Sequence, residues 1–218
     1  MFEEFYPRKF RVPMNISDFA KLGFSQSSFF SGVKKRSQDF TKRQLSGQEA
    51  AFLDREKIRG WLESDYKFVM EEVPVSDAND NFVGRMDRLE FLGIGEYGNK
   101  QLVIIEYKTR NISGVMNPKF FDDYKIQLAT YAFCLKNHPI FHDCDINFAA
   151  LKTRDFHNKE IVHEFIASAQ KLAEWRMDIP KLIETACQLM DGHIKPTGAY
   201  YSMDQKRWVG GSGSRLAW

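Results

Sequence analysis

The chain has 218 residues, of which 43% are hydrophobic and 14% aromatic, and its formal net charge is +2. This size and apolar content suffice for one well-buried α/β domain, and the small net charge neither requires nor excludes a nucleic-acid partner. No apolar run reaches the roughly 20 residues that span a bilayer, and the start Met1–Glu4 lacks the basic and apolar segments of a secretory signal. We therefore expect a soluble intracellular protein without membrane association.

The cysteines and histidines show none of the spacings typical of metal sites. Cys134, Cys144 and Cys187 include no CxxC pair and are odd in number, which argues for a reducing compartment and against a disulfide framework. The histidines are scattered along the chain. No internal repeat or Walker-type phosphate loop is present, so neither a solenoid nor an ATP-driven motor is indicated.

The N-terminal segment combines helix signals with a basic stretch. Asn15–Ser17 can cap a short helix over residues 18–23, and residues 25–28 can begin another. The stretch 34–43 interleaves basic residues with Phe40, so Lys35 and Arg36 are candidates to contact nucleic-acid phosphates. A solvated surface with the Phe40 ring in the core explains the same pattern equally well.

Residues 46–64 are predicted to form a helix. Ser46 is a suitable N-cap, and Glu49 three positions later completes a capping box. An apolar stripe of imperfect spacing follows along the segment.

Three strands are predicted next, joined as an antiparallel meander. Residues 67–75 alternate, residues 77–81 form a turn, and residues 82–92 read as the second strand. A glycine-rich connection leads into residues 101–110, a nearly continuous apolar run that is typical of a buried central strand.

Charged residues stand at the end of this central strand. Side chains alternate along a strand, so Glu106 and Lys108 share one face, and pairing with the preceding strand would bring Asp87 close to Glu106. Two carboxylates without a neighbouring His or Cys favour Mg²⁺ or Mn²⁺ over zinc. Taken alone, a Glu-x-Lys tripeptide is more often a solvated ion pair.

A helix is predicted over residues 119–137, after a loop at the mouth of the proposed site. Gln127 and Tyr131 are one turn apart in it and can both face the strand end. Further strands are predicted at 145–153 and 160–166, followed by a long helix over 167–190 with a kink or break at Pro180.

These elements resemble the PD-(D/E)XK nuclease superfamily and, within it, the RecB-like exonuclease branch. Gly84–Asp87 resembles the GxxD element, Ile105–Thr109 the (D/E)xK element, and Gln127–Tyr131 the QxxxY element. The resemblance implies that Asp87 and Glu106 bind the metal, that Lys108 is the catalytic lysine, and that Gln127 and Tyr131 contact the substrate. It also implies an α/β fold whose central mixed sheet is flanked by helices.

The chain departs from this family upstream, where relatives carry a helical metal-binding His or acid after a glycine. Gly47–Phe52 contains no His, so Glu49 is the expected third metal ligand, with Glu56 as an alternative. The iron–sulfur cluster of some relatives requires four cysteines, so no cluster is expected here. Residues 1–208 are expected to form a single nuclease domain with a helical N-terminal portion, and residues 209–218 a flexible tail that resembles a linker or a remnant of cloning.

The sequence thus predicts a Mg²⁺- or Mn²⁺-dependent exonuclease acting on DNA ends or single strands, with a role in repair or recombination. A helicase or recombination protein would be a separate partner. Two alternatives remain: a catalytically inactive nucleic-acid-binding protein with the same fold, and a restriction-type endonuclease that would need dimerisation and an added recognition surface.

Overall fold

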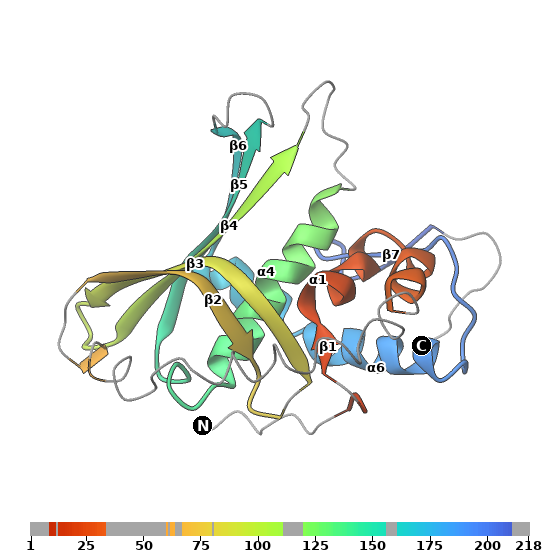
Figure 1. Cartoon of the computed structure of the whole chain (residues 1–218), viewed down its shortest axis with the longest axis horizontal. Helices are drawn as coiled ribbons and strands as arrows, with labels where there is room; N and C mark the ends of the chain where they lie inside the picture. The colour runs from red at the N-terminus through yellow and green to blue at the C-terminus, as the bar shows by residue number, and fades with distance from the viewer. Residues whose placement is uncertain are drawn as a thin grey trace.

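The computed structural model describes residues 9–11, 13–33, 60, 62–63, 67–79, 81–110, 120–155 and 161–210. Within these residues the centre is a six-stranded mixed sheet of order β1-β3-β4-β5-β6, with β2 also paired to β3 (Figure 1). The strands are β1 (Met14–Asn15), β2 (Phe68–Ser76), β3 (Phe82–Ile94), β4 (Lys100–Arg110), β5 (Asp145–Asp155) and β6 (Ile161–Ser168). The predicted fold class, a mixed sheet with flanking helices, is confirmed.

The antiparallel meander predicted from the sequence is present. β2 pairs with β3 in the register Phe68↔Phe91, and β3 pairs with β4 in the register Arg88↔Ile105. β4 then pairs in parallel with β5, which leaves β4 between two neighbours. Its apolar run Leu102–Ile105 is buried on both faces of the sheet, as expected for a central strand.

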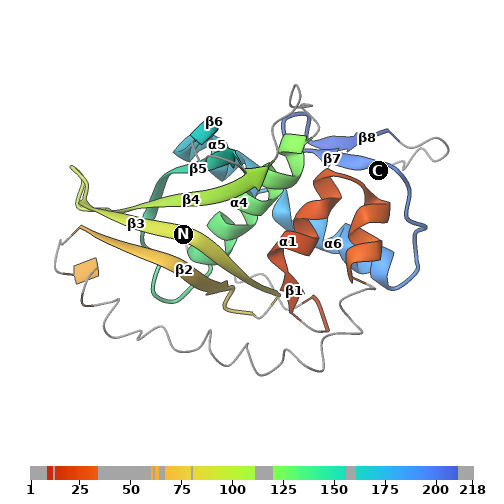
Figure 2. The same cartoon turned by 45° about the horizontal axis from the view of Figure 1, so that its top comes forward.

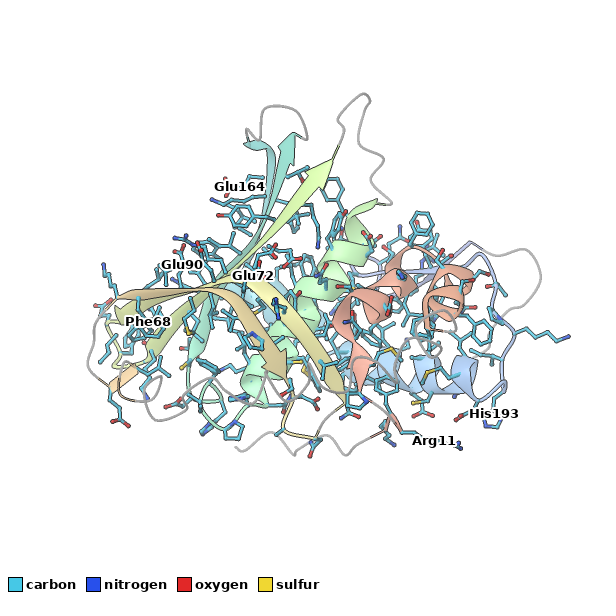
Figure 3. The ribbon with its side chains drawn as sticks, in the orientation of Figure 1. Arg11, Phe68, Glu72, Glu90, Glu164 and His193 are labelled. Carbon is cyan, nitrogen blue, oxygen red and sulfur yellow. The ribbon has the colours of Figure 1, made fainter. Side chains whose placement is uncertain are left out.

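The regular alternation of β2 and β3 is interrupted at the same level in both strands. Met70 and Val73 of β2 are both buried although they are three positions apart, and so are Met86 and Leu89 of β3. Glu72, labelled in Figure 3, lies in this interruption with a φ of 52°, a left-handed conformation that is uncommon for a residue with a side chain. At this level Met86 lies in the core, while the next residue, Asp87, contacts the backbone of β4.

Helix α4 (Phe120–Lys136) lies against the sheet and is contacted by the N-terminal helices (Figure 2). These are α1 (Ile16–Phe19) and the 3₁₀ helix η1 (Ala20–Gly23), and a further helix over residues 26–33 follows them in the chain. As predicted, Asn15 caps α1 by accepting the Ser17 N–H. Residues 126–135 of α4 are all buried, so this helix is enclosed on all sides.

The long helix predicted over 167–190 is wrong. Strand β6 continues to Ser168, whose side chain caps α5 (Ala169–Arg176), and a separate helix α6 (Ile179–Met190) follows. Pro180 lies in the first turn of α6, where its missing N–H removes no helical hydrogen bond. Pro180 therefore lies at the start of a new helix, and the break predicted at this proline separates two helices, α5 and α6.

A C-terminal hairpin of β7 (Tyr200–Ser202) and β8 (Arg207–Val209) is attached to the beginning of α4. Lys125 of α4 forms a 2.5 Å ion pair with Asp204, and the Asp122 carboxylate accepts the Met203 N–H at 3.1 Å. Val209, which the sequence assigns to the tail, pairs with Tyr200 instead. The hairpin fixes the end of α4 that lies nearest the predicted site.

The described residues include no membrane-spanning helix, and their cysteines are free thiols. No helix among the described residues has the length and apolar character that crossing a bilayer requires. Cys134 and Cys144 are buried free thiols, and Cys187 is a partly exposed one.

Candidate active site

Strand pairing brings Asp87 and Glu106 together. The ladder between β3 and β4 ends at Arg88↔Ile105, continuation of its register places Asp87 opposite Glu106, and the charge of Asp87 is close enough to raise the pKa of Glu106. Asp87 Oδ2 accepts the backbone N–H of Tyr107 at 2.6 Å, which holds its carboxylate against β4. A carboxylate has about four acceptor positions, so oxygen lone pairs of Asp87 remain available to a cation.

Glu106 is the most deeply buried charged group of this cluster, with 3% of its surface exposed. Its Oε1 atom accepts hydrogen bonds from Lys108 Nζ and, at 2.8 Å, from Gln127 Nε2. Its Oε2 atom is buried and accepts no hydrogen bond from any described residue. Burial raises the pKa of Glu106, the ammonium of Lys108 opposes that effect, and the charge of Asp87 adds to it.

The two helical residues of the predicted QxxxY element connect this carboxylate to β3. Gln127 Nε2 also donates to the hydroxyl of Tyr131 at 2.8 Å, and that hydroxyl donates to the backbone carbonyl of Arg85 at 2.7 Å. Burial, followed by the nearby Glu106 charge, raises the pKa of Tyr131 well above its ordinary value. Tyr131 therefore remains protonated, and a donor, throughout the physiological pH range.

We expect a Tyr131→Phe substitution to destabilise the protein by about 1–3 kcal/mol, because it leaves the buried Gln127 amide N–H and the partly buried Arg85 carbonyl without their partner. Urea unfolding followed by circular dichroism measures this free energy. Tyr97→Phe is the control, since the Tyr97 side chain is 90% exposed and its hydroxyl should contribute less than about 0.5 kcal/mol. Equal stabilities of the Tyr131→Phe protein and the wild type would contradict the connecting role of this hydroxyl.

Lys108 lies at the accessible side of the cluster, and its side chain is 26% exposed. Its Nζ atom contacts Glu106 and lies 5.6 Å from the centre of the Tyr124 ring on α4. The structure thus brings together Asp87, Glu106, Lys108, Gln127 and Tyr131. The remaining predicted residues, Lys35, Arg36 and Glu49 with its alternative Glu56, lie outside the described residues.

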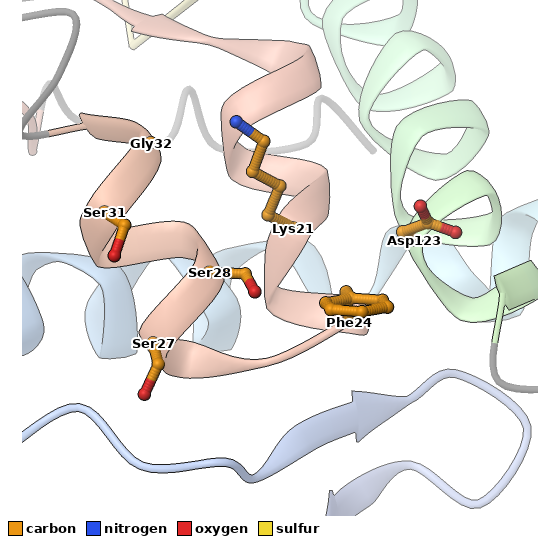
Figure 4. A pocket seen from close by; sticks show the side chains of 7 residues that line it. All are labelled: Lys21, Phe24, Ser27, Ser28, Ser31, Gly32 and Asp123. Atoms are coloured by element: carbon orange, nitrogen blue, oxygen red, sulfur yellow. The ribbon is translucent and has the colours of Figure 1, made fainter.

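A wide depression of about 580 Å³ lies beside the start of α4, lined by Lys21, Phe24, Ser27, Ser28, Ser31, Gly32 and Asp123 (Figure 4). Lys21 Nζ pairs with Asp18 at 2.7 Å, so the lysine charge is compensated. Asp123 adds a negative charge to the lining. The lining therefore carries no excess of positive charge, so it does not favour the binding of nucleic acid, which is a polyanion.

The sequence matches the PD-(D/E)XK nuclease superfamily over residues 15–199. Because this match covers most of the chain, the chain belongs to that superfamily. Membership supports a nuclease, with nucleic acid as the class of substrate, and nucleases of this superfamily generally use a divalent metal.

Comparisons with individual proteins are more distant. No curated protein matches the chain. The solved structure of SSO0001 is 15% identical, with 83% of this chain and 78% of that chain covered and a TM-score of 0.37. An alkaline exonuclease (LHK-Exo) from Laribacter hongkongensis is 13% identical, with 83% of this chain and 92% of that chain covered and a TM-score of 0.37.

The residues in place suit a divalent cation. The unpartnered, buried Oε2 of Glu106 next to a second carboxylate is the hard oxygen environment that Mg²⁺ and Mn²⁺ prefer. Within the described ranges no group of three or more His, Cys, Asp or Glu side chains is gathered around one point. The described part of the chain therefore offers Asp87 and Glu106, and a third protein ligand would have to come from elsewhere.

Proposed function

We propose that this protein is a Mg²⁺- or Mn²⁺-dependent deoxyribonuclease of the RecB-like type that digests DNA from an end or along a single strand. The observation that carries the proposal is the pair of carboxylates of Asp87 and Glu106 with the Lys108 ammonium beside them, one carboxylate oxygen being buried and without a partner. Family membership supports the hydrolytic class, and the RecB-like assignment rests on the resemblance of the three motifs.

In this proposal Asp87 and Glu106 hold the cation, and Glu49 completes its protein ligands. The bound cation would supply a polarised phosphoryl oxygen and a water of lowered pKa. Lys108 donates a hydrogen bond to that water or to a phosphate oxygen, where its positive charge stabilises the charge that develops during hydrolysis. Lys35 and Arg36 are proposed to contact phosphates further along the strand.

The residues on α4 keep the buried carboxylate in one orientation. Gln127 donates to Glu106 Oε1, and the other oxygen, which has no hydrogen-bond partner among the described residues, would be free to bind the cation. Tyr131 in turn fixes Gln127 and the backbone of β3 near Asp87. Such contacts hold the metal-binding carboxylate in place before the cation and the substrate bind.

Digestion of labelled nucleic acids tests the proposal. We expect linear single- or double-stranded DNA with labelled ends to be degraded in Mg²⁺ or Mn²⁺ and to remain intact in EDTA, because the cation is required for hydrolysis. Covalently closed circular DNA should resist, since it offers no end. RNA of the same sequence, examined in parallel, shows whether the enzyme discriminates by sugar.

Two alternative outcomes would replace the proposal. A protein that shifts labelled DNA in a salt-dependent manner, yet leaves its length unchanged in every divalent ion, is a binding protein with a nuclease fold. Cleavage of circles at defined sequences by a dimer identifies a restriction-type endonuclease.

A further inference from the structure

One face of α4 carries a third residue that contacts the site. Tyr124, Gln127 and Tyr131 are spaced i, i+3 and i+7, so they form one stripe along the helix. Tyr131 acts on the backbone of β3, and Gln127 acts on Glu106. Tyr124 contacts Lys108, the third charged group of the site, because its ring centre lies 5.6 Å from Lys108 Nζ.

This distance is within the range of a cation–π interaction, in which the negative face of an aromatic ring attracts an ammonium. Glu106 accepts a hydrogen bond from the same ammonium. In the proposed enzyme Glu106 is also a ligand of the cation, so a share of its negative charge is directed away from Lys108. A second carboxylate beside Lys108 would also attract the metal cation. A neutral aromatic ring attracts the Lys108 ammonium without offering the metal an oxygen ligand.

The arrangement also leaves Lys108 able to act on the substrate. An ammonium has three N–H donors, and a ring face and one carboxylate oxygen do not use all of them. The side chain is 26% exposed, so the remaining N–H groups can reach a water or a phosphate oxygen. The ring therefore restricts the position of the ammonium while its donor capacity is retained.

We propose that Tyr124 is a positioning residue that holds the Lys108 ammonium beside the cation site through the face of its ring. The inference rests on the proposed nuclease function, which it deepens. The ring, rather than the hydroxyl, carries the effect, so Tyr124→Phe should keep the wild-type kcat. Tyr124→Leu should lower kcat by about 2- to 30-fold, the factor that corresponds to a cation–π contact.

The matched control for lost packing is Phe121→Leu. Phe121 lies one turn before Tyr124 on α4, and its ring packs against Phe165 at 6.1 Å between centres. Both leucine variants remove an aromatic ring from the same helix and should lower the melting temperature. The Tyr124→Leu variant alone should also lower kcat, with the Kd for DNA in EDTA unchanged.

A series of phenylalanines with increasing ring fluorination at position 124 gives the decisive measurement. Fluorine weakens the negative ring face with little change in shape, so log kcat should fall steadily with each fluorine added. A flat series in an active enzyme, or a kcat for Tyr124→Leu equal to that of the wild type, would overturn the role of Tyr124 and leave the nuclease function standing. A wild-type protein that leaves DNA intact in every divalent ion would remove both.

Discussion

The Lys108→Ala protein is expected to cleave DNA about 100- to 1,000-fold more slowly than the wild type, the loss that follows removal of one fixed donor from a charged transition state. Lys108 is the cationic donor at the accessible side of the Asp87 and Glu106 pair. The substitution leaves the two carboxylates in place, so cation binding should persist while hydrolysis is lost. Single-turnover digestion of end-labelled DNA in Mg²⁺ measures the rate.

A second lysine provides a matched control. Lys152 of β5 is 24% exposed, close to the 26% of Lys108, and it pairs with a carboxylate at 3.0 Å, although this partner, Glu164, is 41% exposed whereas Glu106 is buried. Lys152→Ala removes the same charge from a neighbouring strand, and its cleavage rate should equal that of the wild type. Equal rates for Lys108→Ala and the wild type, with native circular dichroism spectra, would exclude the proposed chemistry.

Lys108→Ala also has a consequence for Glu106 in the absence of metal. Burial already raises the pKa of Glu106, and the Lys108 ammonium is the largest opposing influence. Without it the pKa of Glu106 should rise further, because the buried carboxylate loses its counter-charge. An infrared titration of the carboxylate band in EDTA follows this change directly.

Much of the site is predictable because its residues occupy regular strands and one helix. The apolar run before Glu106 predicts the buried strand β4, alternation places Lys108 on the same face, and the hairpin spacing brings Asp87 beside them. The helical repeat places Gln127 and Tyr131 on one face of their helix, and the resemblance to the nuclease superfamily implies that this face meets the strand end. The strand, hairpin and helix inferences depend on local geometry, whereas the contact between helix and strand depends on the resemblance.

Other features depend on tertiary contacts that leave no periodic signal. β1 comprises only Met14–Asn15, too short for any alternation to be recognised. The interruption at Glu72 is not marked by a glycine, although its backbone is left-handed. Residues 126–135 of α4 are buried on every face of the helix, so the spacing of the α4 residues does not distinguish Tyr124 as a neighbour of Lys108.

The Glu106→Gln substitution should have opposite effects on stability and on activity. The amide keeps the shape of the side chain and its Oε1 acceptor but removes the negative charge, so we expect cation binding and DNA cleavage to be lost. Without metal the variant should be more stable than the wild type near neutral pH, because an ionised carboxylate no longer has to be buried.

The dependence of this difference on pH follows from the direction of the pKa shift. The folded-state pKa of Glu106 is raised, so the wild type is stabilised by protonation of Glu106 at low pH and loses that contribution as the pH rises through the folded-state pKa. The amide does not titrate. The stability advantage of Glu106→Gln, measured by urea unfolding in EDTA, should therefore be absent below the ordinary pKa of glutamate, about 4.3, and grow towards neutral pH.

Addition of Mg²⁺ should reverse the order of the two proteins. A ligand that binds only the folded state at a hundredfold excess over its Kd stabilises it by about 2.7 kcal/mol, so the wild type should gain stability and the variant should not. Glu164→Gln is the control, because Glu164 is a 41% exposed partner of Lys152 whose neutralisation should leave both the Mg²⁺ effect and cleavage unchanged. An equal Mg²⁺-induced stabilisation of the Glu106→Gln protein and the wild type would show that the cation binds elsewhere, because the buried Oε2 of Glu106 is the atom on which this site depends.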